Sequence, residues 1–183
     1  MTNSPGQSLL TCGFQGAAVR VVVAGQTFVA DFTGHVTLAL DRNVLAQYEQ
    51  GAVDVVPLVI EEYVANGVGA VIGAISVIKD TSRDSGPSRM TAIAPGAPFP
   101  AVQDLSINMN VSIPALLPNV TLRNNLPPNP GPPVLRNSNV TAFPPQNDIY
   151  QLVEPIELED INNPGPVLAT ISNFPITVNP PTA

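Results

Sequence analysis

Residues 18–40 read AVRVVVAGQTFVADFTGHVTLAL, and this stretch decides the predicted fold. It holds three runs rich in β-branched and aromatic residues, separated by connectors of three residues that each contain a glycine. The runs are residues 18–23, 27–32 and 36–40. Such a pattern is typical of an antiparallel β-meander. We therefore expect three short strands joined by two turns, with Gly25 and Gly34 at positive φ.

A short helix is predicted near residues 41–51, directly after the meander. The Asp41 side chain can accept hydrogen bonds from the free amides of a first helical turn. Gly51 can end the helix in a left-handed conformation. Because Val44, Leu45 and Tyr48 fall on one face, we expect a helix of roughly two to three turns that packs on the meander.

Two apolar segments follow the predicted helix. Residues 52–60 are expected to form a strand, in which Pro57 marks an edge or a bend because proline cannot donate to a ladder. Residues 63–78 are the most apolar run, with Gly69 and Gly73 at a spacing seen between membrane helices. The run is shorter than the about 20 residues that a membrane span needs. We expect a buried strand pair, or a core strand shared between subunits.

Proline dominates the second half of the chain. Of the 21 prolines, all but Pro5 and Pro57 lie at or after residue 87. Proline fixes φ and supplies no backbone donor, so long helices and central strands are disfavoured there. The predicted fold class is mainly β, with a small β-rich head at 1–86. Residues 87–183 are expected to form short strands and polyproline-like segments, either as an extended arm or as a second small β-domain.

The charge pattern excludes a nucleic-acid role. The formal net charge of the 183 residues is −7, and seven lysines and arginines are scattered along the chain, so no basic stripe is available for phosphates. Only 11% of residues are charged, against about 25% in ordinary soluble domains. The first residues lack a basic region followed by an apolar one, so we expect synthesis in a cytoplasm.

Residues for common catalytic chemistry are scarce. His35 is the single histidine and lies in a predicted turn, away from any nucleophile in the sequence. Cys12 is the single cysteine, which excludes an intrachain disulfide and suggests a buried thiol. A metal site built from several His and Cys side chains is impossible. We expect no catalytic residue, no cofactor and no metal site, and hence no enzyme activity.

The densest acidic cluster comprises Glu154, Glu157, Glu159 and Asp160. On an alternating strand, Glu157 and Glu159 would share one face and Asp160 would lie on the other. The spacing matches no calcium-binding loop. We interpret the cluster as a solvated face, with a weak cation site between subunits as the alternative.

Part of the first half resembles small β-modules of tailed-bacteriophage virions. The resemblance covers residues 21–38, the predicted helix and the strand that starts at residues 51–55. The shortage of charge and the Pro/Asn-rich second half are similar to accessory structural proteins of such particles. This resemblance implies a capsid decoration or cement protein, located in the virion. It also implies two partners, the major capsid protein and further copies of this chain, commonly in trimers.

An alternative role is a binding module. In this interpretation the second half folds as a β-sandwich, as in a phage tail or head-fibre adhesin, and its Asn- and Thr-rich loops bind a glycan. The chain has six phenylalanines, three tyrosines and no tryptophan, so it offers few aromatic platforms for a sugar.

Overall fold

The computed structural model describes residues 6–125 and 132–179 and confirms a mainly β protein. Its described residues contain thirteen strands and one helix. The elements are β1 Gln7–Val23, β2 Gln26–Asp41, α1 Arg42–Glu49, β3 Val55–Gly69, β4 Gly73–Lys79, β5 Ser88–Ala94, β6 Ala97–Ser106, β7 Met109–Ser112, β8 Leu122–Asn124, β9 Val134–Val140, β10 Asp148–Leu152, β11 Ile156–Asp160, β12 Asn163–Asn173 and β13 Ile176–Asn179.

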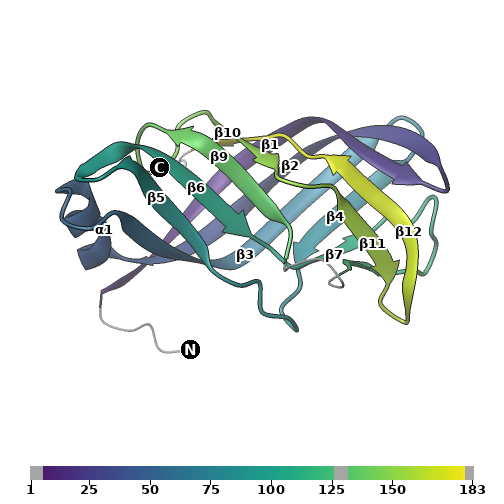
Figure 1. Cartoon of the computed structure of the whole chain (residues 1–183). Helices are drawn as coiled ribbons and strands as arrows, with labels where there is room; N and C mark the ends of the chain where they lie inside the picture. Colours follow the sequence, from purple (N-terminus) through teal and green to yellow (C-terminus); the bar gives the residue numbers. More distant parts are fainter. Residues whose placement is uncertain (1–5, 126–131, 180–183) are drawn as a thin grey trace.

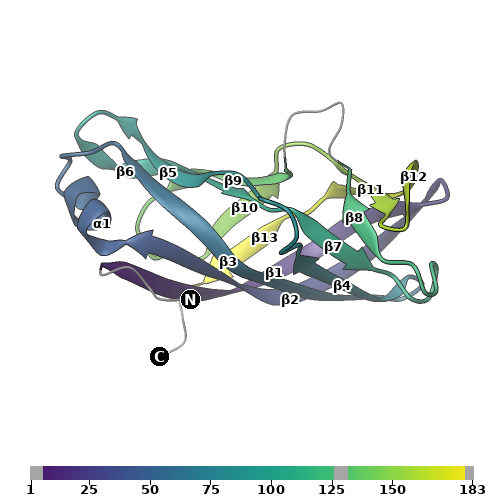
Figure 2. The same ribbon diagram turned by 90° about the horizontal axis from the view of Figure 1, so that it is seen from below.

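These strands make one closed antiparallel sheet. β1, β2 and β3 are long and uninterrupted, with 17, 16 and 15 residues. The other ten strands lie end to end in pairs, and each pair takes the place of one long strand. We call these pairs broken strands: β4–β5, β6–β7, β8–β9, β10–β11 and β12–β13. Each broken strand is antiparallel to its neighbours. Both β12 and β13 pair with β1, which closes the sheet. Figures 1 and 2 show the resulting elongated shape, with α1 at one end and the β11–β12 turn at the other.

The interior of the closed sheet is filled by side chains. Inward positions alternate with outward ones along β1, where Cys12, Phe14, Val19 and Val21 are at most 3% exposed. One continuous cluster of buried apolar residues draws on strands from the whole length of the chain. Burial of this apolar surface is the main term that favours folding.

Two inward glycines make room for aromatic rings. A Cβ on Gly34 would lie 2.6 Å from Cζ of Phe14, and one on Gly67 would lie 2.6 Å from Cζ of Phe32. The Phe14 ring also stacks on Tyr63, with 5.1 Å between centroids. Glycine is therefore required at these positions by packing, because any side chain would collide with a ring.

The five broken strands are interrupted at a common level, which we call the waist. The interruptions lie between β4 and β5, β6 and β7, β8 and β9, β10 and β11, and β12 and β13. At the same level β1 is bulged at residues 17–18 and β3 at Glu61. Prolines occupy four of the interruptions, at Pro87, at Pro132 and Pro133, at Pro155 and at Pro175. Since proline donates no backbone hydrogen bond, ladders stop there.

The predicted helix and the first predicted turn are confirmed. α1 begins after Asp41, whose Oδ1 accepts a hydrogen bond of 2.7 Å from the Asn43 amide. Gly51 has φ of 71° and Gly25 has φ of 78°, as expected for a helix end and a tight turn. Tyr48 is fully buried on the inner face of α1.

Two local predictions are wrong. Gly34 is not a turn residue, because the predicted strands 27–32 and 36–40 form the single strand β2. The small and polar residues 1–13 predict a lead-in strap before the first strand, but β1 already begins at Gln7. In both places tertiary pairing with neighbouring strands extends the strand through weak local sequence.

Residues 63–78 form a strand pair, as one prediction had it. They comprise the end of β3, a tight turn and β4, and β4 pairs on its other edge with β7 of the same chain. Ile72 is fully buried within this chain, whereas Val68, Val71 and Ile78 of the same run are 69%, 74% and 45% exposed. No helix in the described part of the chain is long and apolar enough to cross a membrane.

The boundary predicted near Gly86 lies in the interruption between β4 and β5. Strands on both sides of it belong to the same sheet, and side chains on both sides enter the same core. The predicted arm, residues 87–183, therefore contributes β5–β13 to the closed sheet. The proline-dense piece at 126–131, expected to be polyproline-like, lies outside the described residues.

We predict that Gly67→Ala destabilises the protein by about 1–3 kcal/mol, because the new methyl group collides with the buried Phe32 ring. Gly13→Ala is the matched control, since a Cβ there meets only the Gly34 carbonyl oxygen at 3.9 Å. Urea unfolding measures both variants. Equal midpoints for the two would contradict the packing role of Gly67.

Candidate functional site

A gap opens in the wall of the closed sheet at the waist, between the broken strands β8–β9 and β10–β11. Backbone hydrogen bonds mark its two ends: the Asn125 amide donates to the Glu157 carbonyl at 2.8 Å, and the Val153 amide donates to the Val134 carbonyl at 3.0 Å. Between these bonds the chain passes through Pro155, which cannot donate. The gap is therefore a consequence of the proline interruptions.

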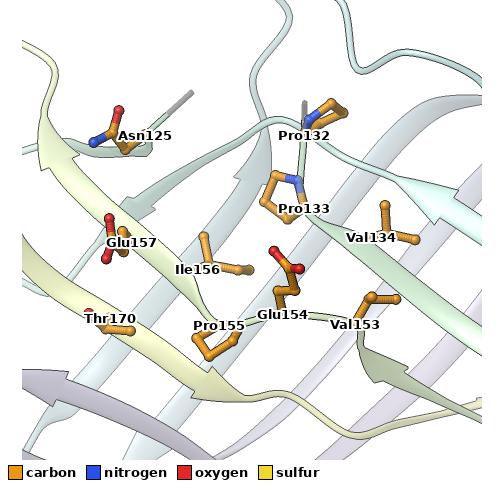
Figure 3. A pocket seen from close by; sticks show the side chains of 10 residues that line it. All are labelled: Asn125, Pro132, Pro133, Val134, Val153, Glu154, Pro155, Ile156, Glu157 and Thr170. Carbon is orange, nitrogen blue, oxygen red and sulfur yellow. The ribbon is translucent and has the colours of Figure 1, made fainter. Parts of the chain in front are cut away.

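This gap forms the waist pocket, with a cavity volume of about 470 Å³. Figure 3 shows the lining side chains. They are Asn125, Pro132, Pro133, Val134, Val153, Glu154, Pro155, Ile156, Glu157 and Thr170. Six of the ten are proline, valine or isoleucine, so most of the lining is apolar. Ile156 is 2% exposed and joins the pocket floor to the core of the protein.

The polar groups of the pocket come from several segments of the chain. Glu157 lies directly opposite Thr170 in the β11–β12 ladder, and the Asn125 backbone is bonded to Glu157. Glu154 comes from the segment between β10 and β11, and in Figure 3 its carboxylate is directed toward Pro133. No Lys, Arg or His of residues 6–125 and 132–179 forms an ion pair with either glutamate.

The predicted acidic cluster is divided by the fold. Glu154 and Glu157 line the pocket, while Glu159 is only 5% exposed and turns to other partners. Its carboxylate accepts hydrogen bonds of 2.8 Å from the Gly165 amide and 2.9 Å from Arg123. The Gly165 bond, supported by Arg123 and opposed by burial, holds the pKa of Glu159 below its usual value. Asp160 caps the β11–β12 turn through the Asn162 amide.

Within the described ranges no group of three or more His, Cys, Asp or Glu side chains is arranged to hold a metal ion. The alternative of a weak cation site between subunits at Glu154, Glu157, Glu159 and Asp160 stays a prediction, because a single chain does not test it.

The two residues with catalytic potential lie away from the waist pocket. His35 is on the outer face of β2, with Nε2 3.2 Å from Oε2 of Glu62 on β3. Cys12 is fully buried on the inner face of β1, and burial raises the pKa of its thiol to about 11. A thiol with this pKa stays protonated near neutral pH and is a poor nucleophile.

A buried polar network ties the waist together beside the pocket. The Arg83 guanidinium contacts Asp80 at 2.6 Å and donates to Asn124 at 2.8 and 2.9 Å. Asn124 in turn donates to Asn108 at 2.9 Å and accepts from the Met109 amide. Although burial opposes it, bonds from Ser82 and Arg83 hold the pKa of Asp80 below its usual value. This network was missed from the sequence, where Arg83 and Asp80 belong to an apparently exposed polar loop.

A second buried polar row crosses the sheet nearer to α1. Gln103, Asn137 and Tyr150 lie side by side on the inner faces of β6, β9 and β10. The Tyr150 hydroxyl donates to Gln103 at 2.5 Å. The amide nitrogens of Gln103 and Asn137 are buried and have no hydrogen-bond partner among the described residues. No sequence pattern singled out this row.

Comparisons with known proteins bear on the fold. No protein-family model matches the chain, and no curated protein matches it. Among solved structures it is similar to DynF from the dynemicin biosynthesis pathway of Micromonospora chersina. The TM-score is 0.80 at 17% sequence identity, and the match covers 98% of this chain and 83% of that chain. At this identity the likeness shows a shared fold.

The structural match overturns the predicted phage function. Nearly the whole chain shares its fold with a biosynthesis-pathway protein. This finding contradicts the hypothesis of a capsid decoration protein and the alternative of a phage adhesin with a β-sandwich second half. The physical reason is that both hypotheses depended on an independent second half, whereas β5–β13 complete the sheet begun by β1–β4.

We predict that Arg83→Met destabilises the protein by about 3–5 kcal/mol, because it leaves the buried Asp80 carboxylate without its charged partner. Arg136→Met is the matched control: Arg136 also pairs with an aspartate, Asp104, but is 45% exposed, so its loss costs about 1 kcal/mol or less. Chemical denaturation measures the free energy of unfolding of both variants. A similar loss of stability in both would refute the role of Arg83 as the charged partner of Asp80.

Proposed function

We propose that the protein binds one small, mainly apolar organic molecule in the waist pocket and acts as a binding protein in small-molecule biosynthesis. The observation that carries the proposal is the pocket itself. Its volume of about 470 Å³ lies within the about 300–1,000 Å³ typical of ligand sites. An apolar lining with a few convergent polar groups is also typical of such sites.

The fold supports a binding role. Closed antiparallel sheets of about eight strands are wide enough for packed side chains or for one small ligand. Here the interior is filled by side chains, and the available space lies in the wall, where proline interrupts the ladder. DynF, which has a similar fold, comes from a pathway that makes a small molecule, and this supports the biosynthetic context.

The residues of the pocket favour binding over catalysis. Its described lining residues include no Ser, Cys, His, Lys or Tyr, so they lack the Ser–His and Cys–His pairs of common covalent catalysis. His35 and Cys12 are on other surfaces of the sheet. We therefore propose that any chemistry on the ligand is performed by another protein.

Nile red, a neutral apolar dye that fluoresces in apolar surroundings, tests this proposal. We expect it to bind the wild-type protein at one site, and Val153→Trp to weaken binding by about tenfold or more, because the indole fills the pocket rim. Val153 is 49% exposed, so the substitution leaves the core intact.

The matched control is Val29→Trp, since Val29 is 51% exposed on β2 and does not line the pocket. It should bind the dye as the wild type does. Unchanged dye affinity in Val153→Trp, with both variants folded by circular dichroism, would overturn the waist pocket as the binding site.

A further inference from the structure

The waist pocket combines two kinds of lining group, proline rings and hydrogen-bond acceptors. Pro132, Pro133 and Pro155 contribute their rings to the lining, and none of them has a backbone donor. Glu157 and Thr170, which face each other across the β11–β12 ladder, contribute acceptor oxygens. Flat proline surfaces suit the face of an aromatic or alicyclic ring, while the acceptor oxygens suit a group that donates hydrogen bonds.

The charge in the pocket is negative and is not balanced within it. Among the described lining residues, Glu154 and Glu157 are charged and none is basic. The arginines of the adjoining strands are engaged elsewhere: Arg123 pairs with Glu159 at 2.9 Å, and Arg136 pairs with Asp104 at 2.6 Å. The formal net charge of the whole chain, −7, adds to the negative electrostatic potential at the pocket.

The two carboxylates also lie on either side of the pocket floor. They flank Pro155 and Ile156 in the chain, and Figure 3 shows Glu154 directed toward Pro133 and Glu157 on the other side of Ile156. A cationic group above Ile156 would therefore meet a carboxylate on each side. Charge-assisted hydrogen bonds of this kind are about twice as strong as neutral ones, and an anion would be repelled from both directions.

We propose that the ligand of the waist pocket is a ring-containing amine, bound as its ammonium form. This inference rests on the proposed function and specifies its ligand class. The ring packs against the proline rings and the pocket floor. The ammonium donates hydrogen bonds to Glu154, Glu157 and the Thr170 hydroxyl, and the negative charge of the pocket selects it over neutral and acidic compounds of the same shape.

Three naphthalene compounds of similar shape test the ligand class by displacement of bound Nile red: 1-naphthylmethylamine, 1-naphthalenemethanol and 1-naphthoate. At neutral pH and low salt we expect the amine to bind about tenfold or more tightly than the alcohol, and the carboxylate to bind least. The double variant Glu154→Gln with Glu157→Gln should reduce the amine to the affinity of the alcohol.

The control is a double variant with the same change of net charge, Glu49→Gln with Glu61→Gln, at exposed glutamates outside the pocket. It should keep the preference for the amine. Equal affinities for all three compounds in the wild type, or an equal loss in both double variants, would overturn the amine class.

These outcomes are distinct from a failure of the proposed function. If Val153→Trp loses Nile red binding but the three compounds displace the dye equally from the wild type, the waist pocket is the binding site and the amine class is wrong. If Val153→Trp binds the dye normally, both the pocket and the amine are wrong.

Discussion

The pairing of the last broken strand with the first strand is the interaction on which the structure depends. β12 meets β1 from Arg20 to Val23, and β13 meets it from Gly13 to Gln15. These bonds join residues more than a hundred positions apart, and they remove the two free edges that an open sheet of this length would expose. Closure also encloses the apolar faces of all strands in one core, so the burial energy of both halves of the chain is gained together.

The waist is the level at which the ladders of the sheet are interrupted. Five of the strands lose their ladder there, and Pro87, Pro155 and Pro175 mark three of the breaks. On one side the buried Asp80–Arg83–Asn124 network replaces the missing ladder bonds. Between β8–β9 and β10–β11 the described residues provide no such replacement, and the space becomes a pocket. The same proline chemistry that interrupts the sheet thus produces its candidate binding site.

This arrangement gives the protein a place for a ligand without opening the core. The interior keeps its packed aromatic contacts, such as Phe14 on Tyr63 and Phe32 near Phe174. The pocket lies in the wall and is open to solvent, so a ligand can enter and leave it. Pro132 and Pro133 come from one segment of the chain, and Glu154, Pro155 and Glu157 come from another. A binding protein of this design needs no histidine or reactive thiol, which fits a chain in which His35 lies on the surface and Cys12 is buried.

Local chemistry determined part of the fold from the sequence alone. Asp41 and Gly51 set the ends of α1, Gly25 set a turn, and the β-branched runs predicted a β protein, because these features depend on neighbouring residues. Only the tertiary structure decided the role of Gly34, which makes room for the Phe14 ring, and the division of the acidic cluster between pocket and core. It also decided that the proline-rich half completes the sheet. These features depend on strand pairing across the whole chain, and pairing between distant residues leaves no local pattern in the sequence.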